Sequence, residues 1–216
     1  MAVIHRTTMK PGKLELIAAW LPARPWYTGT SGAPELTRAG GFRLDDPEGE
    51  VGIEFVVVTD VSGTGPVAYL VPLTYRGAPL GGAEQGLVGT SEHGVLGTRW
   101  IYDGAHDPVL TERLLALLRG DAEPQHQSLT GVPDPAVVPE AAEGALPAGA
   151  AVVAVEDGPQ GTRLVVEAGG RRLGLELVRV PEDGLTGPGA LGRVTAEWEL
   201  PDGTRARGAV AVLREG

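Results

Sequence analysis

The chain has 216 residues, 42% of them hydrophobic, and a mean hydropathy of zero, which suits one or two compact units with a core of moderate size. Its formal net charge is −10 and its acids are scattered, which argues against a nucleic-acid partner because phosphate contacts need a basic face. Cysteine is absent, which excludes disulfides and thiolate chemistry. Neither a signal-peptide segment nor an apolar run of about eighteen residues occurs, so we expect a cytoplasmic protein without membrane contact.

The first half of the chain predicts one helix and a strand hairpin. Apolar residues at helical spacing predict a short helix at residues 13–21, and a proline follows it. Residues 22–41 are rich in Gly, Pro, Ser and Thr and are predicted to be irregular. Two segments rich in β-branched residues, 51–60 and 67–75, flank a Gly/Ser-rich turn and predict an antiparallel hairpin. Pro72 in the second segment suits an edge strand or a bulge.

A third strand and a second helix follow. Residues 98–103 (TRWIYD) read as a strand, and residues 109–119 carry a leucine stripe at helical spacing. Asp107 is placed to cap this helix, Pro108 occupies its first turn, and Gly120 follows its basic last turn. These signals together predict a helix beginning directly after Asp107.

The second half of the chain predicts β structure. Residues 121–149 have no periodicity and the composition of a linker. Residues 150–216 alternate strand-like runs with turn pairs, including a Pro-Asp-Gly turn at residues 201–203. We therefore expect an α+β fold whose first domain spans residues 1–120 and whose residues 150–216 form a small β-rich domain or extend the first sheet.

The segment at residues 91–110 gathers acids and histidines that could bind a metal or serve in acid–base chemistry. His93 and His106 lie thirteen residues apart and match no ligand spacing, and Asp107 is already explained as a helix cap. Local hydrogen bonding or solvation is the simpler interpretation of such histidines. We predict no catalytic, cofactor-binding or metal-binding residue here, and leave open whether the two histidines face a ligand or water.

A glycine-rich segment at residues 187–194 (GPGALGRV) fits the glycine loop of protein kinases. Kinase chemistry also needs a lysine and an asparagine, yet no lysine follows Lys13 and the chain has no asparagine. We therefore interpret this segment as a turn.

Four of the ten aromatic side chains lie in two short segments. Trp26 and Tyr27 precede the predicted hairpin, and Trp100 and Tyr102 lie in the third strand. Packing between a helix and the sheet is the interpretation we favour, because each ring buries a large area. The alternative is a ligand or partner surface to which His93 and His106 also contribute, with a sugar stacked beside Trp26, Tyr27 and Trp100.

Three motifs resemble the N-terminal cap domain of actinobacterial maltokinases and related aminosugar kinases. They are WLPARPWY at residues 20–27, YLVPL at 69–73 and YDGAHDP at 102–108, and their order and spacing agree with the family over about residues 12–120. One departure is Pro25, which occupies the position where the family carries arginine. In the full-length kinases the cap precedes two lobes that bind ATP and sugar; the motifs of those lobes are missing, so no catalytic residue carries over.

The resemblance implies a curved antiparallel sheet with two helices, of cystatin-like character. It also implies a non-catalytic accessory protein that needs no cofactor and binds a partner, a kinase or another enzyme of maltose, trehalose or α-glucan metabolism. Two alternatives stay open: a module that binds a small sugar or glucan, and an enzyme acting on 1,4-α-glucan with residues 91–107 as its acid–base groups. Homo-oligomerisation is compatible with each of them.

Overall fold

The computed structural model of the chain describes residues 8–29, 32–147, 149–185 and 189–216. Antiparallel β-sheet is the main regular structure of the described chain, and two α-helices are added to it. The helices are α1 (Lys13–Trp20) and α2 (Pro108–Arg119). Short 3-10 turns lie at Leu21–Ala23, Glu84–Gly86 and Gly104–His106. The strands are β1 (Met9–Lys10), β2 (Leu36–Leu44), β3 (Gly52–Asp60), β4 (Val67–Arg76), β5 (Leu87–His93), β6 (Gly97–Asp103), β7 (Gln125–His126), β8 (Val138–Ala141), β9 (Ala151–Gly158), β10 (Gly161–Ala168), β11 (Arg171–Leu177), β12 (Gly192–Glu199) and β13 (Arg205–Glu215).

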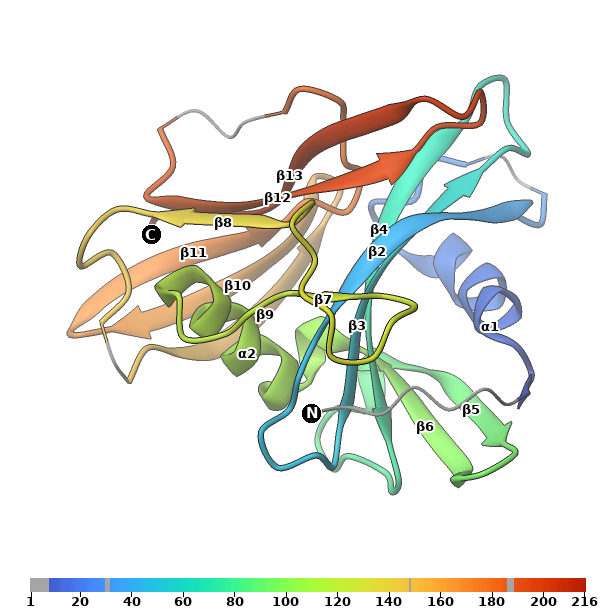
Figure 1. Cartoon of the computed structure of the whole chain (residues 1–216), viewed down its shortest axis with the longest axis horizontal. Helices are drawn as coiled ribbons and strands as arrows, with labels where there is room; N and C mark the ends of the chain where they lie inside the picture. The colour runs from blue at the N-terminus through green and yellow to red at the C-terminus, as the bar shows by residue number, and fades with distance from the viewer. Residues whose placement is uncertain (1–7, 30–31, 148, 186–188) are drawn as a thin grey trace.

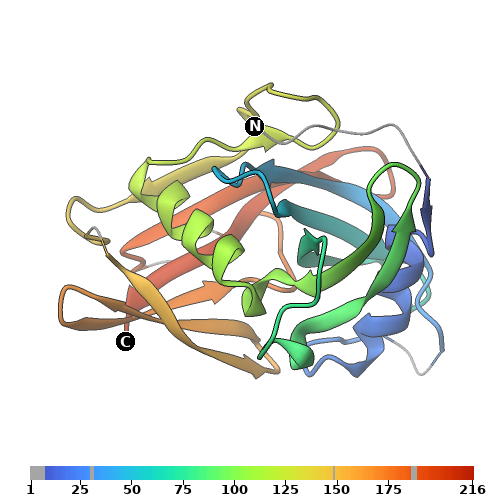
Figure 2. The ribbon, with the colours of Figure 1, turned by 90° about the horizontal axis from the view of Figure 1, so that it is seen from below.

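The strands form one curved sheet in the order β1-β5-β6-β4-β3-β2-β12-β13-β11-β10-β9, while β7 pairs with β2 and β8 pairs with β12. Its two halves meet at β2 and β12 through a single pair, Gly40 with Trp198. The curved sheet has α1 on its outer side and α2 inside its curve (Figures 1 and 2). This arrangement confirms the predicted fold class, a curved antiparallel sheet with two helices followed by a β-rich C-terminal part.

Two hydrophobic cores lie on opposite faces of the sheet. In β3, Val56 and Val58 face the core beneath α1, whereas Phe55 and Val57 face the core around α2. This alternation follows from the two-residue period of a strand, and it explains why nearly all of β3 is buried. The core around α2 also contains Leu164 and other residues of the C-terminal strands, so both halves of the sheet share it.

The helix α2 begins as the sequence predicts. The Asp107 carboxylate accepts a hydrogen bond from the Val109 amide at 3.0 Å, which caps the helix, and Pro108 fills its first position. Arg76 also donates to both oxygens of Asp107, at 2.6 and 2.7 Å. Gly120 ends the helix in the left-handed conformation, with φ of 82°. The predicted first helix, the first hairpin and the strands of the C-terminal part are likewise confirmed.

The strand β2 begins within a segment that was expected to be irregular. Residues 22–41 were predicted to be irregular, but β2 begins at residue 36 and includes Gly40 and Gly41. A Cβ atom at Gly41, where φ is 134°, would lie 2.1 Å from the Phe55 carbonyl oxygen, so this glycine permits close approach within a strand and does not mark a turn. Residues 91–93, which begin the segment rich in acids and histidines, are the end of β5.

Pro72 has neighbouring strands on both sides of β4, so β4 is not an edge strand of the sheet. However, β6 pairs only with residues 73–76 of β4, and Pro72 lies just outside that stretch. Its nitrogen is on the same side of β4 as the Leu70 amide, which points away from β3 toward the Arg179 carbonyl oxygen. The missing donor therefore breaks no strand pairing.

The segment at residues 121–149, expected as a linker, carries β7 and β8 and buries Val137, Ala145 and Leu146 in the core around α2. The irregular structure predicted for it is therefore only partly observed, and the domain boundaries stay a prediction. Residues 186–188, which include the start of the glycine-rich segment interpreted as a turn, lie outside the described residues.

Candidate functional site

A buried ion pair joins the end of β6 to the segment after β11. The Arg179 guanidinium donates to the Asp103 carboxylate at 2.6 Å, and the two side chains are 0% and 1% exposed. Arg179 also donates from Nε to the Thr162 hydroxyl at 2.7 Å. Asp103, a candidate for chemistry at the sequence level, is thus occupied by a structural contact between the two halves of the chain.

An aromatic cluster packs under α1 beside this ion pair. The Arg179 guanidinium lies 4.9 Å from the centre of the Trp26 ring, which in turn contacts Trp20 at 5.9 Å and Tyr69 at 6.2 Å between ring centres. Trp26 is only 1% exposed, so its ring has no free face on which a sugar could stack. Tyr27 packs against Tyr69 and donates to Asp60 at 2.8 Å. Burial and the Asp60 contact raise the pKa of Tyr27 to about 12.

Trp100 and Tyr102 point to the other face of the sheet. Ile101 between them belongs to the core under α1, so alternation along β6 directs both aromatic side chains away from Trp26 and Tyr27. The Tyr102 hydroxyl accepts a hydrogen bond from the Leu80 amide at 2.9 Å, and this ring is buried. The four aromatic residues therefore do not converge on one surface.

The two histidines of the predicted ligand or partner surface lie in local contacts. Nδ1 of His93 accepts hydrogen bonds from the Val95 and Leu96 amides at 3.3 and 3.0 Å, in the turn between β5 and β6. His106 ends the 3-10 turn before α2 and packs against Gly86. Within the described ranges, no three His, Cys, Asp or Glu side chains are grouped closely enough to hold a metal ion.

A second buried carboxylate, Glu54, lies at the start of α1. It accepts hydrogen bonds from the Lys13 ammonium at 2.5 and 2.6 Å, from the Tyr75 hydroxyl at 2.9 Å and from the Gln127 amide at 2.6 Å. Burial opposes ionisation, but the Lys13 charge and these hydrogen bonds outweigh it and lower the pKa of Glu54. Burial and the Glu54 charge raise the pKa of Tyr75 well above its ordinary value. Glu54 is thus held as an anion, which suits anchoring more than proton transfer.

A polar groove of about 340 Å³ lies where β2 and β12 meet, and we call it the β2–β12 groove. It lies over the single pair between Gly40 and Trp198, next to a bulge in β2. Bulges of this kind commonly re-aim side chains beside functional sites. The groove is lined by Arg38, Ala39, Gly40, Gly41, His126, Gln127, Ser128, Asp134, Ala136, Glu197, Trp198, Glu199 and Arg205.

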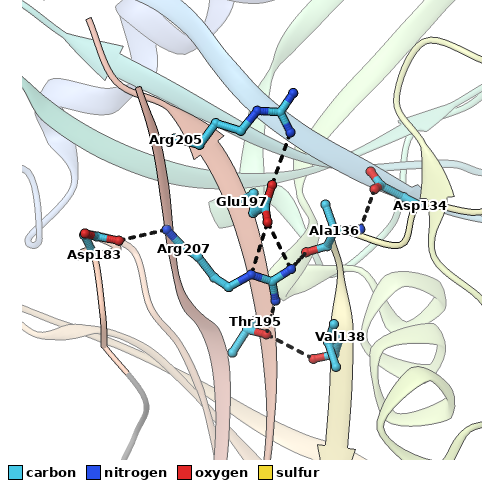
Figure 3. A network of polar contacts seen from close by, with 8 residues as sticks. All are labelled: Asp134, Ala136, Val138, Asp183, Thr195, Glu197, Arg205 and Arg207. Carbon is cyan, nitrogen blue, oxygen red and sulfur yellow. Dashed lines mark hydrogen bonds and ion pairs between the residues drawn. The ribbon is translucent and has the colours of Figure 1, made fainter. Parts of the chain in front are cut away.

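The charged side chains of the groove are held in a network. Glu197 lies between two arginines and accepts from Arg205 at 3.2 Å and from Arg207 at 3.2 and 3.3 Å (Figure 3). Arg207 continues to the Thr195 hydroxyl at 3.1 Å and the Ala136 carbonyl oxygen at 3.0 Å. These contacts tie the segment before β8 to the polar face of β12 and β13.

Part of this groove was visible in the sequence. In β12, Thr195, Glu197 and Glu199 alternate with buried apolar residues, which marks one polar face of the strand. Nothing in the sequence placed Arg38 or Gln127 opposite that face, because their positions depend on the single pair between β2 and β12. None of the groove residues is among the site residues predicted from the sequence.

The fold and the groove define a β-rich α+β protein whose first half is one helix packed on an antiparallel sheet. In a comparison with protein families, residues 20–107 match the maltokinase N-terminal cap domain. This stretch is therefore similar to the maltokinase N-terminal cap domain, as the sequence motifs implied. No curated protein matches the chain.

The matched stretch ends at the cap of α2, so only part of the β2–β12 groove lies within it. Arg38 and the glycines of β2 are inside the match, whereas Gln127, Glu197 and Arg205 are outside it. Among the described residues, neither helix has the length and apolar character needed to cross a membrane.

Proposed function

We propose that this chain is a non-catalytic accessory protein linked to maltose, trehalose or α-glucan metabolism, which acts by binding a partner protein. The partner would be a kinase or another enzyme of that metabolism. The observation that carries the proposal is the match of residues 20–107 to the cap domain of a maltokinase.

The state of the buried acids supports a non-catalytic role. Asp103 is paired with Arg179, Asp107 with Arg76, and Glu54 with Lys13. A general acid usually needs a carboxyl group whose pKa is raised toward neutrality, yet the pKa of Glu54 is lowered. The acids that the fold buries here therefore stabilise the cap-like sheet.

The hairpin of β5 and β6 supports contact with a partner. Its turn exposes Val95 by 62% and Leu96 by 44%, and Leu87 at the start of β5 is 40% exposed. Val95 and Leu96 are neighbours in the turn, whereas Leu87 lies at the other end of the hairpin. Contiguous exposed apolar surface is a common feature of protein-binding sites, and the turn supplies it here. Substitutions in the turn of this hairpin therefore provide the first test of partner binding.

Affinity purification of the full chain from its native host tests the proposal. We expect a kinase or glucan-pathway enzyme to be recovered and to re-form the complex when both proteins are purified. The variant V95S/L96S should weaken recovery about tenfold, while V153S, which alters a valine of β9 that is 50% exposed, should not. A chain that elutes alone at its own mass under mild conditions would contradict the proposal.

A further inference from the structure

We propose that the β2–β12 groove binds a small neutral ligand with adjacent hydroxyl groups, of the size of a monosaccharide or disaccharide. This site is separate from the β5–β6 hairpin, so it goes beyond the partner-binding role and does not depend on it.

The balance of charge points to a neutral ligand. Three carboxylates line the groove, Asp134, Glu197 and Glu199, and two guanidinium groups, Arg38 and Arg205, line it with them. A third guanidinium group, that of Arg207, contacts Glu197 directly. With three charges of each sign, a charged ligand would meet repulsion as well as attraction.

Hydroxyl groups fit this mixture because each can donate and accept. A hydroxyl donates to a carboxylate, which only accepts, and accepts from a guanidinium group, which only donates. Two neighbouring hydroxyls can therefore use Glu199 or Asp134 as acceptors and Arg38 or Arg205 as donors. Such charge-assisted hydrogen bonds are about twice as strong as bonds between neutral groups.

Several groove side chains are held in place by the protein itself. The Gln127 amide nitrogen donates to Glu54 at 2.6 Å, while its oxygen accepts from Arg38 at 3.1 Å. Glu197 is fixed by Arg205 and Arg207 (Figure 3). A ligand that meets ordered side chains costs less conformational entropy on binding. The groove is thus a prepared polar surface.

The size of the groove sets the size of the ligand. Its volume of about 340 Å³ is near the lower end of the range for small-molecule sites. Arg38 also lines a neighbouring hollow of about 340 Å³ beside the start of α1, which Lys13 and Glu15 help to form. A ligand of one or two sugar rings fits a volume of this size.

Calorimetry and amide chemical-shift mapping on the full chain test this site, with glucose, maltose and maltotriose as neutral probes. Glucosamine and glucose 6-phosphate serve as charged probes, and glycerol serves as a probe without a ring. We expect saturable binding of a neutral sugar, with shifts concentrated at Gly40, Gly41 and Gln127. E199Q and D134N keep the side-chain shape and should each raise the dissociation constant about tenfold, the effect of losing one hydrogen bond to a charged group.

The matched control is E167Q, which alters an exposed carboxylate of β10 outside the groove and should leave the dissociation constant unchanged. The proposal is overturned if none of the neutral sugars gives a saturable signal, if E199Q and D134N bind like E167Q, or if the charged sugars or glycerol bind as well as maltose. Recovery of the protein partner by the same variants is measured separately. Retained recovery without sugar binding would refute the groove site alone.

Discussion

Loss of the ion pair between Asp103 and Arg179 should destabilise the whole molecule. In the variant D103N the amide keeps the shape of the side chain and can still accept the weak hydrogen bond from the Ala105 amide, at 3.3 Å. The Arg179 guanidinium, 0% exposed, then lacks its counter-ion. Because the guanidinium is fully buried, water cannot readily replace the lost contact.

The magnitude follows from the burial of both groups. Removing one partner of a buried ion pair costs about 3–5 kcal/mol because an uncompensated charge stays inside. For a chain of this length, that corresponds to a fall in Tm of about 6–20 °C. The double variant D103L/R179M removes both charges and should recover most of the loss, although it forfeits the contact of the guanidinium with Trp26, worth about 1–2 kcal/mol.

Urea and thermal unfolding followed by tryptophan fluorescence measure these changes, since Trp26 lies against Arg179. The control is E215Q, which breaks the exposed pair of Glu215 with Arg171 and should cost less than about 1 kcal/mol. The reasoning is refuted if D103N unfolds like E215Q, or if the double variant loses the sum of the two single losses.

Three further predictions concern the other buried polar groups. D107A should cost about 2–4 kcal/mol in urea unfolding, because it removes the cap of α2 and the partner of Arg76, while D107N should keep the cap and lose only the ion pair. The pKa of Glu54 is lowered in the folded state, so its ionised form stabilises the fold above about pH 4.5, and this stabilisation is lost as the pH falls. In the variant E54Q, the free energy of unfolding should therefore fall less steeply at acid pH. An unchanged acid dependence would contradict this. The pKa of Tyr27 is raised to about 12, so the protonated hydroxyl stabilises the folded state fully below about pH 10, and this stabilisation is lost toward pH 12. In urea unfolding, the variant Y27F should lack this loss of stability at alkaline pH.

Local signals in the sequence were sufficient for most helices and strands. The start of α2 was predicted from Asp107 and Pro108 because capping depends on only a few neighbouring residues. The strands β3 and β4 were predicted from their β-branched residues and the turn between them. The short strands β7 and β8 were missed because two and four residues carry no periodicity. They form only because β2 and β12 offer them unpaired backbone groups.

The buried arginine could not be predicted for a different reason. Arg179 is 76 residues from Asp103 in sequence, and an arginine between two valines resembles an exposed position of a strand. Its burial arises because the chain after β11 turns toward β4, where the Arg179 carbonyl oxygen accepts from the Leu70 amide at 2.9 Å. Only the packing of the two halves of the sheet reveals that this charge lies inside.

The same packing explains why the groove lies across the boundary of the cap-like stretch. The polar face of β12 could be read from its alternation, but a polar face alone is an ordinary solvated surface. It becomes one wall of a groove because β2 approaches β12 at Gly40 and diverges on either side, and because Gln127 crosses above Gly41 to reach Glu54. The proposed binding at this place therefore depends on both halves of the chain, because Arg38 comes from β2 whereas the carboxylates of the groove come from residues 134–199.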